Sequence, residues 1–252
     1  MSSVREHYEH LLAKHYLWMT GMPFEEKVRE QQALLDQTMK KFGASISPGL
    51  ALDLGSGPGF QSLALAQLGF SPVFAIDSGT ELLKELTVRA GAHDIRTIEM
   101  DLTSLATLPV EEPATLALCM GDTLTHLPSR QIVQQLFIDV FARLSANGLF
   151  VITYRDLTIE LTGTERFIPV RSDKEKVMIC FLEFDNPESV LVHDIVHVQG
   201  ADGAVLEKSC YRKLRLPQNW VSRELQNAGF HVVSEELNGR FDLLVARKQR
   251  VE

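Results

Sequence analysis

A short acidic, glycine-rich stretch has the residue types and spacing best suited to binding chemistry in this sequence. Asp53 lies near the end of an apolar run, and Gly55, Gly57 and Gly59 follow it at every second position. Because glycine has no Cβ, such a bend lets a ligand approach the backbone closely. A helical pattern begins directly afterwards, and the first amides of a helix point toward a bound group. The stretch therefore predicts a ligand site where a strand turns into a helix.

The spacing of these glycines excludes two common classes of nucleotide site. A dinucleotide fingerprint needs G-x-G-x-x-G, but position 60 is Phe. A phosphate-binding Walker loop needs Gly-Lys followed by Ser or Thr, and no Lys follows these glycines. A carboxylate two positions before G-x-G-x-G suits a ligand with a cationic amino acid end, an adenosine end and no phosphate. The alternative is a tight turn that binds nothing.

Two further carboxylates end strand-like runs. Asp77 ends the run 72–77, and it lies 24 residues after Asp53, close to the position where α/β nucleotide sites hold ribose hydroxyls. Asp101 follows a third such run that begins at Ile95. Because ligands of doubly wound sheets bind outside the carboxyl ends of the strands, we expect all three carboxylates at one crevice. Asp77 could also cap the helix that follows Ser78 and Gly79.

Residues 53–59 resemble motif I of the class I S-adenosylmethionine-dependent methyltransferases, (D/E)-x-G-x-G-x-G. The resemblance implies S-adenosyl-L-methionine as cofactor and S-adenosyl-L-homocysteine as product. It implies that Asp53 anchors the amino acid end of the cofactor, directly or through water, and that the cofactor lies on the backbone of Gly55, Gly57 and Gly59. By the same resemblance the other cofactor-binding residues are Asp77 and Ser78 at the ribose, Asp101 and Leu102 at the adenine, and Met120 and Gly121 at the methyl-bearing end.

Three residues near strand ends are candidates for the methyl-transfer step. His126 follows the fourth strand, and a neutral imidazole there could accept a proton from the acceptor. Tyr154 and Arg155 emerge at the end of the fifth strand, where we expect them to face the crevice and hold a polar small molecule. The alternatives are a turn histidine with no chemical role and a structural ion pair between Arg155 and Asp156.

The surrounding pattern predicts an α/β fold: a doubly wound, mostly parallel, seven-stranded sheet of the Rossmann-like methyltransferase type. Strand-like runs at 50–54, 72–77, 95–102, 114–120 and 149–154 alternate with helical runs at 60–68, 80–90 and 129–144. Residues 217–228 predict a last helix, and a hairpin turns at Asn238-Gly239. Between them, residues 157–216 predict an inserted antiparallel β meander on the substrate side.

Residues 1–43 predict an N-terminal helical cap with helices at 5–19 and 25–42. Tyr8, Tyr16 and Trp18 crowd its first helix. Either this helix caps the edge of the sheet, or it is a lid over the substrate mouth whose aromatic side chains form part of the acceptor site. We expect residues 1–252 to form a single methyltransferase domain.

Composition limits the remaining possibilities. With 45% hydrophobic and 23% charged residues, the chain can bury a full core. Its net charge of −8 argues against a nucleic-acid partner. The start of the sequence lacks an apolar signal core, no apolar run is long enough to span a bilayer, and the three cysteines lie far apart. We therefore expect a cytoplasmic protein without a metal site or a membrane.

From these residues we expect an enzyme that transfers a methyl group to a small-molecule acceptor by direct in-line displacement. Two alternatives stay open. One is a non-catalytic, cofactor-binding regulatory protein that kept the fold, since fold does not fix function. The other is an NAD-dependent oxidoreductase, which the glycine spacing opposes.

Overall fold

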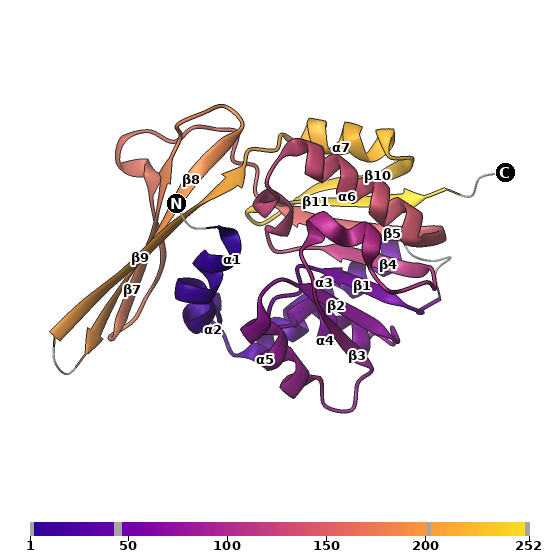
Figure 1. Ribbon diagram of the computed structural model, residues 1–252, viewed down its shortest axis with the longest axis horizontal. Coiled ribbons are helices and arrows are strands. Elements are labelled where there is room, and N and C mark those ends of the chain that lie inside the picture. Colours follow the sequence, from indigo (N-terminus) through magenta and orange to yellow (C-terminus); the bar gives the residue numbers. More distant parts are fainter. Residues whose placement is uncertain (1–2, 43–46, 201–202, 250–252) are drawn as a thin grey trace.

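The computed structural model describes residues 3–42, 47–200 and 203–249 and contains two separate β-sheets. A seven-stranded sheet has the order β10-β11-β5-β4-β1-β2-β3, and a four-stranded sheet has the order β6-β7-β8-β9. Figure 1 shows the four-stranded sheet standing beside the larger α/β body. The ends of two predicted ranges, residues 1–2, 43 and 250–252, lie outside the described residues.

The seven-stranded sheet confirms the predicted doubly wound fold. Its parallel strands are β1 (Ala51–Leu54), β2 (Val73–Asp77), β3 (Ile95–Glu99), β4 (Ala114–Cys119) and β5 (Leu144–Tyr154). The hairpin of β10 (Phe230–Asn238) and β11 (Phe241–Lys248) completes the sheet, with β11 antiparallel to β5. The central strands are almost entirely apolar because helices cover both of their faces.

Alternate residues of the central strands enter two different cores. Phe150 and Ile152 of β5 pack on one side, together with α6 (Arg130–Arg143), α7 (Gln218–Asn227) and the short helix η3 (Leu102–Thr107). Leu149 and Val151 face the other core, which holds α3 (Phe24–Phe42), α4 (Phe60–Gln67) and α5 (Thr80–Ala90). This alternation follows from the two-residue period of a strand. The result is a sheet between two layers of helices.

The inserted segment forms the predicted antiparallel sheet. After the short helix η5 (Gly163–Arg166) come β6 (Phe167–Ser172), β7 (Lys176–Glu183), β8 (Ser189–Gly200) and β9 (Gly203–Leu214). The strands β8 and β9 pair along their whole length. The four-stranded sheet is inserted in the chain between β5 and α7, so both of its ends lead back to the α/β body.

The first helical segment packs against the four-stranded sheet, and its Arg5 also pairs with Glu99 at the end of the edge strand β3. It consists of α1 (Val4–His7), a π-helical turn η1 (Tyr8–Leu12), η2 (Ala13–His15) and α2 (Tyr16–Thr20). Figure 1 shows it between the two sheets. Leu11 and Leu12 pack against Met178 and Val196 of the four-stranded sheet, which holds the segment on that side.

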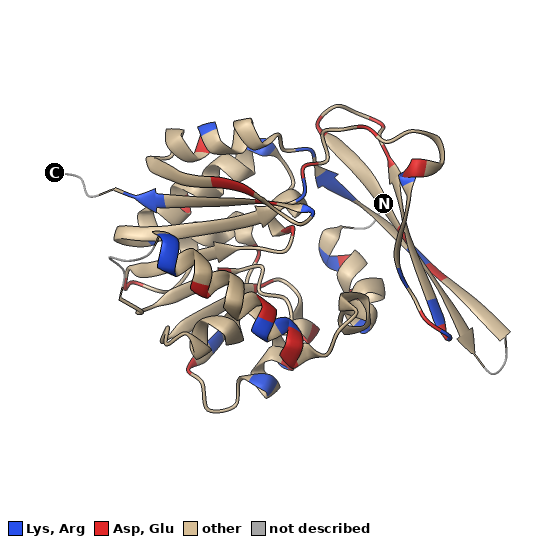
Figure 2. Ribbon diagram, turned by 180° about the vertical axis from the view of Figure 1, so that it is seen from behind, with Lys and Arg blue, Asp and Glu red and all other residues tan. Residues whose placement is uncertain are grey.

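Charged residues of both signs are interspersed over the helices and the sheet margins (Figure 2), as expected for helices with one solvated face. Among the described helices, none combines the length and the apolarity needed to cross a membrane.

The packing of α6 generates a prediction about stability. Phe137 is 0% exposed, whereas its neighbour Ile138 is 50% exposed on the same helix. We expect Phe137→Ala to lower the free energy of unfolding by about 3–5 kcal/mol, because it leaves a cavity in the core. The matched variant Ile138→Ala should change it by about 0.5 kcal/mol or less. Urea unfolding measures both values, and equal losses would contradict the assignment of this face.

Candidate functional site

The glycine bend joins β1 to α4, and its three glycines have positive φ angles of 76°, 52° and 93°. A Cβ on Gly55 would lie 2.3 Å from Thr123, and one on Gly59 would lie 2.1 Å from Leu86, so packing excludes side chains at both positions. A Cβ on Gly57 would meet only the Tyr16 hydroxyl, at 3.9 Å. Gly57 therefore faces open space, which is where a ligand could lie against the backbone.

A cavity of about 1530 Å³ opens beside this bend. It runs from the carboxyl ends of the parallel strands to the four-stranded sheet, and the N-terminal segment forms part of its wall. Ten of the predicted site residues line it: Gly55, Gly57, Asp77, Ser78, Asp101, Leu102, Met120, Gly121, His126 and Arg155. Tyr8 and Tyr16 also line it, whereas Trp18 does not.

Asp77 at the end of β2 accepts hydrogen bonds from two backbone amides in the cavity wall. Its Oδ2 accepts the N–H of Gly57 at 2.8 Å, and its Oδ1 accepts the N–H of Gly79 at 2.7 Å. Each carboxylate oxygen has a second lone pair, so the group can still accept hydroxyl hydrogens from a ligand. Burial raises the pKa of Asp77, while these amides oppose the shift.

The third carboxylate has a local structural role as well. Asp101 caps η3, and its Oδ1 accepts the N–H of Thr103 at 2.8 Å. Leu102 is buried and lies beside it in the cavity wall. On the other side of the bend, the N–H of Gly121 donates to Thr153 Oγ1 at 2.9 Å. The space where a Gly121 side chain would be is open, which suits a close approach by a ligand.

Asp53 and Gly59 do not line the cavity. Asp53 is only 1% exposed and lies beneath the bend, where its Oδ2 accepts the Ser62 hydroxyl at 2.6 Å. Burial raises the pKa of Asp53 to about 7, and the Ser62 hydrogen bond opposes the shift. Direct contact between Asp53 and a ligand in the cavity is therefore absent from this arrangement. The side chain instead ties the bend to the first turns of α4.

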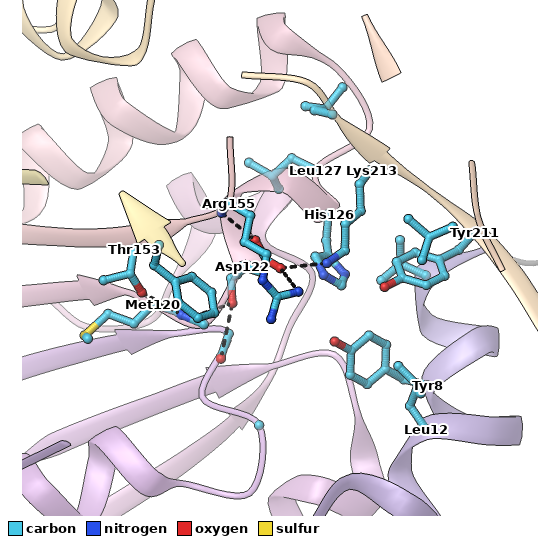
Figure 3. A pocket seen from close by; sticks show the side chains of 18 of the residues that line it. Tyr8, Leu12, Met120, Asp122, His126, Leu127, Thr153, Arg155, Tyr211 and Lys213 are labelled. Atoms are coloured by element: carbon cyan, nitrogen blue, oxygen red, sulfur yellow. Dashed lines mark hydrogen bonds and ion pairs between the residues drawn. The ribbon is translucent and has the colours of Figure 1, made fainter. Parts of the chain in front are cut away.

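A charged cluster lies next to Gly121. Asp122, which has a left-handed φ of 83°, accepts a hydrogen bond from Lys213 Nζ at 2.8 Å through Oδ2, and the same oxygen forms an ion pair with Arg155 Nη1 at 3.0 Å. Its Oδ1 accepts the backbone N–H of Arg155 at 2.8 Å. Burial favours the neutral acid, but the charges of Lys213 and Arg155 outweigh it and lower the pKa of Asp122 to about 2. The cluster connects β4, β5 and β9 at the cavity wall (Figure 3).

His126 is in the cavity wall and lies between two tyrosine rings. The ring centroids of Tyr8 and Tyr211 lie 5.6 and 5.4 Å from its own. Burial first, and then the charge of Lys213, lower the pKa of His126 to about 3. The imidazole is therefore neutral at physiological pH, and one of its nitrogens can accept a hydrogen bond.

Tyr154 corrects one expectation about the crevice. It is 0% exposed and belongs to the core that contains Phe150 and Ile152, so the prediction that it faces the crevice is wrong. All three residues have the same parity along β5, which directs them to the face of the sheet that α6 and α7 cover. Arg155 is the next residue, and its 47% exposed side chain lies in the cavity and pairs with Asp122, not with Asp156.

Two residues in the cavity wall carried no signal in the sequence. Lys213 and Tyr211 lie on β9, in the segment whose role the sequence leaves open, and they reach Asp122 and His126 only through the fold. Lys213 is 7% exposed. In the sequence, a lysine within a strand pattern is expected to be solvent-exposed. Only its pairing with Asp122 in the fold shows that Lys213 is buried.

Comparison with known proteins agrees with this geometry. Residues 51–148 match the profile of a family described as Methyltransferase domain. The glycine/sarcosine N-methyltransferase of Aphanothece halophytica is 27% identical over 127 residues, which are 50% of this chain and 46% of that protein. The chain thus spans about half the length of the curated relatives that it matches.

Solved structures match over nearly the whole chain. The CcbJ methyltransferase from Streptomyces caelestis superposes with a TM-score of 0.75 at 20% identity, covering 96% of this chain and 98% of that one. CalS10, an amino pentose methyltransferase from Micromonospora echinaspora with S-adenosylmethionine bound, superposes with a TM-score of 0.73 at 15% identity, covering 94% and 97%.

Residues 51–148 therefore resemble a methyltransferase domain, and the fold of the chain is that of solved methyltransferases, one of them with S-adenosylmethionine bound. The resemblance seen in residues 53–59 is confirmed at this level.

The burial of Asp53 predicts an unusual pH dependence of stability. Its pKa in the folded protein is about 7, above the usual 3.8, so between these values only the folded protein keeps the proton. The contribution of this group to stability therefore falls as the pH rises from about 4 to about 7. Asp53→Asn cannot titrate, and we expect its stability relative to the unchanged protein to increase across that window. Urea unfolding at a series of pH values tests this, and parallel curves would contradict it.

Proposed function

We propose that this protein binds S-adenosyl-L-methionine and transfers its methyl group to a small-molecule acceptor. One observation carries the proposal: a single cavity joins the glycine bend, Asp77 and Asp101 to a chamber walled by the four-stranded sheet. Such an arrangement provides one place for a cofactor and a second place for an acceptor. Residues 157–216 then form the substrate-side part of a single methyltransferase domain.

The residues beside the bend fit this cofactor. Gly57 leaves open the space that a Cβ would fill, and the Asp77 carboxylate has free lone pairs for a vicinal diol. The buried hydroxyl of Ser56, inside the bend, has no hydrogen-bond partner among the described residues. We assign Asp77 and Ser78 to the ribose, Asp101 and Leu102 to the adenine, and Met120 and Gly121 to the methyl-bearing end. Asp53 supports the bend from below.

The chain's own residues would align the reactants and exclude water. When bound, the cofactor supplies a methyl group on a positively charged sulfur, which is already activated for transfer. The protein then needs mainly to orient and desolvate the acceptor. Neutral His126 is placed to accept a hydrogen bond from the methyl-accepting group, and Arg155 is placed to orient a polar part of the acceptor. We do not assign Tyr154 a role in this reaction, because its side chain is in the core.

An amine is the acceptor that the relatives favour. The curated relatives are named as N-methyltransferases of glycine and sarcosine, and CalS10 is named as acting on an amino pentose. The product would be S-adenosyl-L-homocysteine.

The three free cysteines fit a reducing compartment, so we propose a cytoplasmic location.

Removing the Asp77 carboxylate should weaken cofactor binding. We expect Asp77→Ala to lower the affinity for S-adenosyl-L-homocysteine by about 1–3 kcal/mol, because hydrogen bonds to a charged group are lost. Isothermal titration measures the change. The control is Asp36→Ala, which removes an exposed carboxylate paired with Lys40 on α3, away from the cavity.

The same titration tests the proposed function itself. The unchanged protein should bind S-adenosyl-L-homocysteine and should not bind NADH. Unchanged affinity in a folded Asp77→Ala protein would overturn the ribose assignment. A protein that bound NADH but not S-adenosyl-L-homocysteine would overturn the proposed function.

A further inference from the structure

The cavity is larger than a cofactor site requires. Pockets for one small ligand have volumes of roughly 300–1000 Å³, whereas this one measures about 1530 Å³. The cofactor residues lie at its strand-end side, from Gly55 to Gly121. The remaining volume lies toward the N-terminal segment and the four-stranded sheet, and it is enough for an acceptor much larger than glycine.

The far wall of this chamber is mainly apolar. We call it the acceptor wall and define it by the cavity-lining residues Leu12, Met19, Ile168, Met178, Leu182 and Val192. The register of the sheet pairs Leu182 with Val192 and Val192 with Tyr211, so these side chains share one face. Leu12, Met178, Leu182 and Val192 are at most 4% exposed, whereas Met19 and Ile168 are partly exposed. An acceptor on this wall would remove apolar surface of Met19 and Ile168 from water, which favours an apolar body.

The charged side chains on the same face of the sheet are already paired. Asp194 Oδ2 lies 2.9 Å from His7 Nε2, and Lys213 Nζ lies 2.8 Å from Asp122 Oδ2. Both pairs are buried. A hydroxyl-rich body such as a sugar would find few free partners on this wall, and its polar groups would lose water without compensation.

Three polar groups converge where the chamber meets the cofactor side. Tyr8, Tyr211 and His126 come from the N-terminal segment, β9 and the β4–α6 connection, and Figure 3 shows their rings around one space. Their side-chain polar atoms have no hydrogen-bond partner within residues 3–42, 47–200 and 203–249. Two hydroxyls and a neutral imidazole can together hold a small group that both donates and accepts hydrogen bonds.

We propose that the acceptor is an amine attached to an apolar body, with the body on the acceptor wall and the amino group between Tyr8, Tyr211 and His126. This inference rests on the proposed function. The amine must enter the reaction as the free base, because its lone pair forms the new nitrogen–carbon bond while the carbon–sulfur bond breaks. The ammonium product then releases a proton to solvent.

The experiment compares amines with different bodies on the protein saturated with S-adenosyl-L-homocysteine. The probes are benzylamine and 2-phenylethylamine, with glycine and glucosamine as the small and the polar counterparts. We expect the two apolar amines to bind about tenfold or more tightly than the other two, as burial of a phenyl group implies. With S-adenosyl-L-methionine, they should also give the faster release of S-adenosyl-L-homocysteine.

A matched pair of variants locates the preference. Ile168→Gln places a polar group on the acceptor wall and should reduce the preference for the apolar amines about threefold or more. Val205→Gln changes an exposed residue of the same sheet that does not line the cavity, and it should leave the preference unchanged. Equal or tighter binding of glycine or glucosamine, no binding of either apolar amine, or an unchanged preference in Ile168→Gln would overturn the inference. Absence of S-adenosyl-L-homocysteine binding would instead overturn the proposed function.

The two tyrosines provide a separate test of where the amino group lies. Tyr8→Phe and Tyr211→Phe keep the rings and remove only the hydroxyls. We expect each to weaken benzylamine binding about 2- to 10-fold, because one hydrogen bond is lost, while the affinity for S-adenosyl-L-homocysteine stays the same. Unchanged benzylamine binding in both variants would overturn this placement of the amino group.

Discussion

The ammonium group of Lys213 on β9 lies 2.8 Å from the carboxylate of Asp122, which is in the turn that follows β4. Each would be costly to bury alone, so each stabilises the buried position of the other. Asp122 also accepts a hydrogen bond from the backbone N–H of Arg155 at the end of β5 and forms an ion pair with its side chain. This pair therefore fixes how the inserted sheet stands relative to the strand ends, and with it the shape of the cavity between them.

The glycine bend serves both packing and binding, and the structure separates the two. Gly55 and Gly59 are required because Thr123 and Leu86 occupy the space around them. Gly57 alone leaves its side open to the cavity. Two of the three glycines in this ligand-binding motif are thus required by packing inside the protein. A substitution at either of these two positions would disturb folding before it affected a ligand.

Local patterns in the sequence were enough to predict the sheet, the meander and the placing of Asp77 and Asp101, because strand ends and glycine turns are local signals. The orientation of Tyr154 was not predictable in the same way. A central strand that is apolar on both faces gives no sign of which face a residue takes. Lys213 and Tyr211 lie about 90 residues from Asp122 and His126, and only the packing of β9 against residues 122–126 brings them together.

The N-terminal segment, between the two sheets, has a consequence for how the chain reaches its native state during synthesis. Leu11 and Leu12 leave the ribosome well before Met178 and Val196, which cover them. Until β7 and β8 emerge, this apolar turn has no native surface to pack against, and it is open to chaperones and to self-association. Strands β1 to β5 can begin to assemble in the meantime, whereas the cavity between the two sheets can close only after β7, β8 and β9 have emerged.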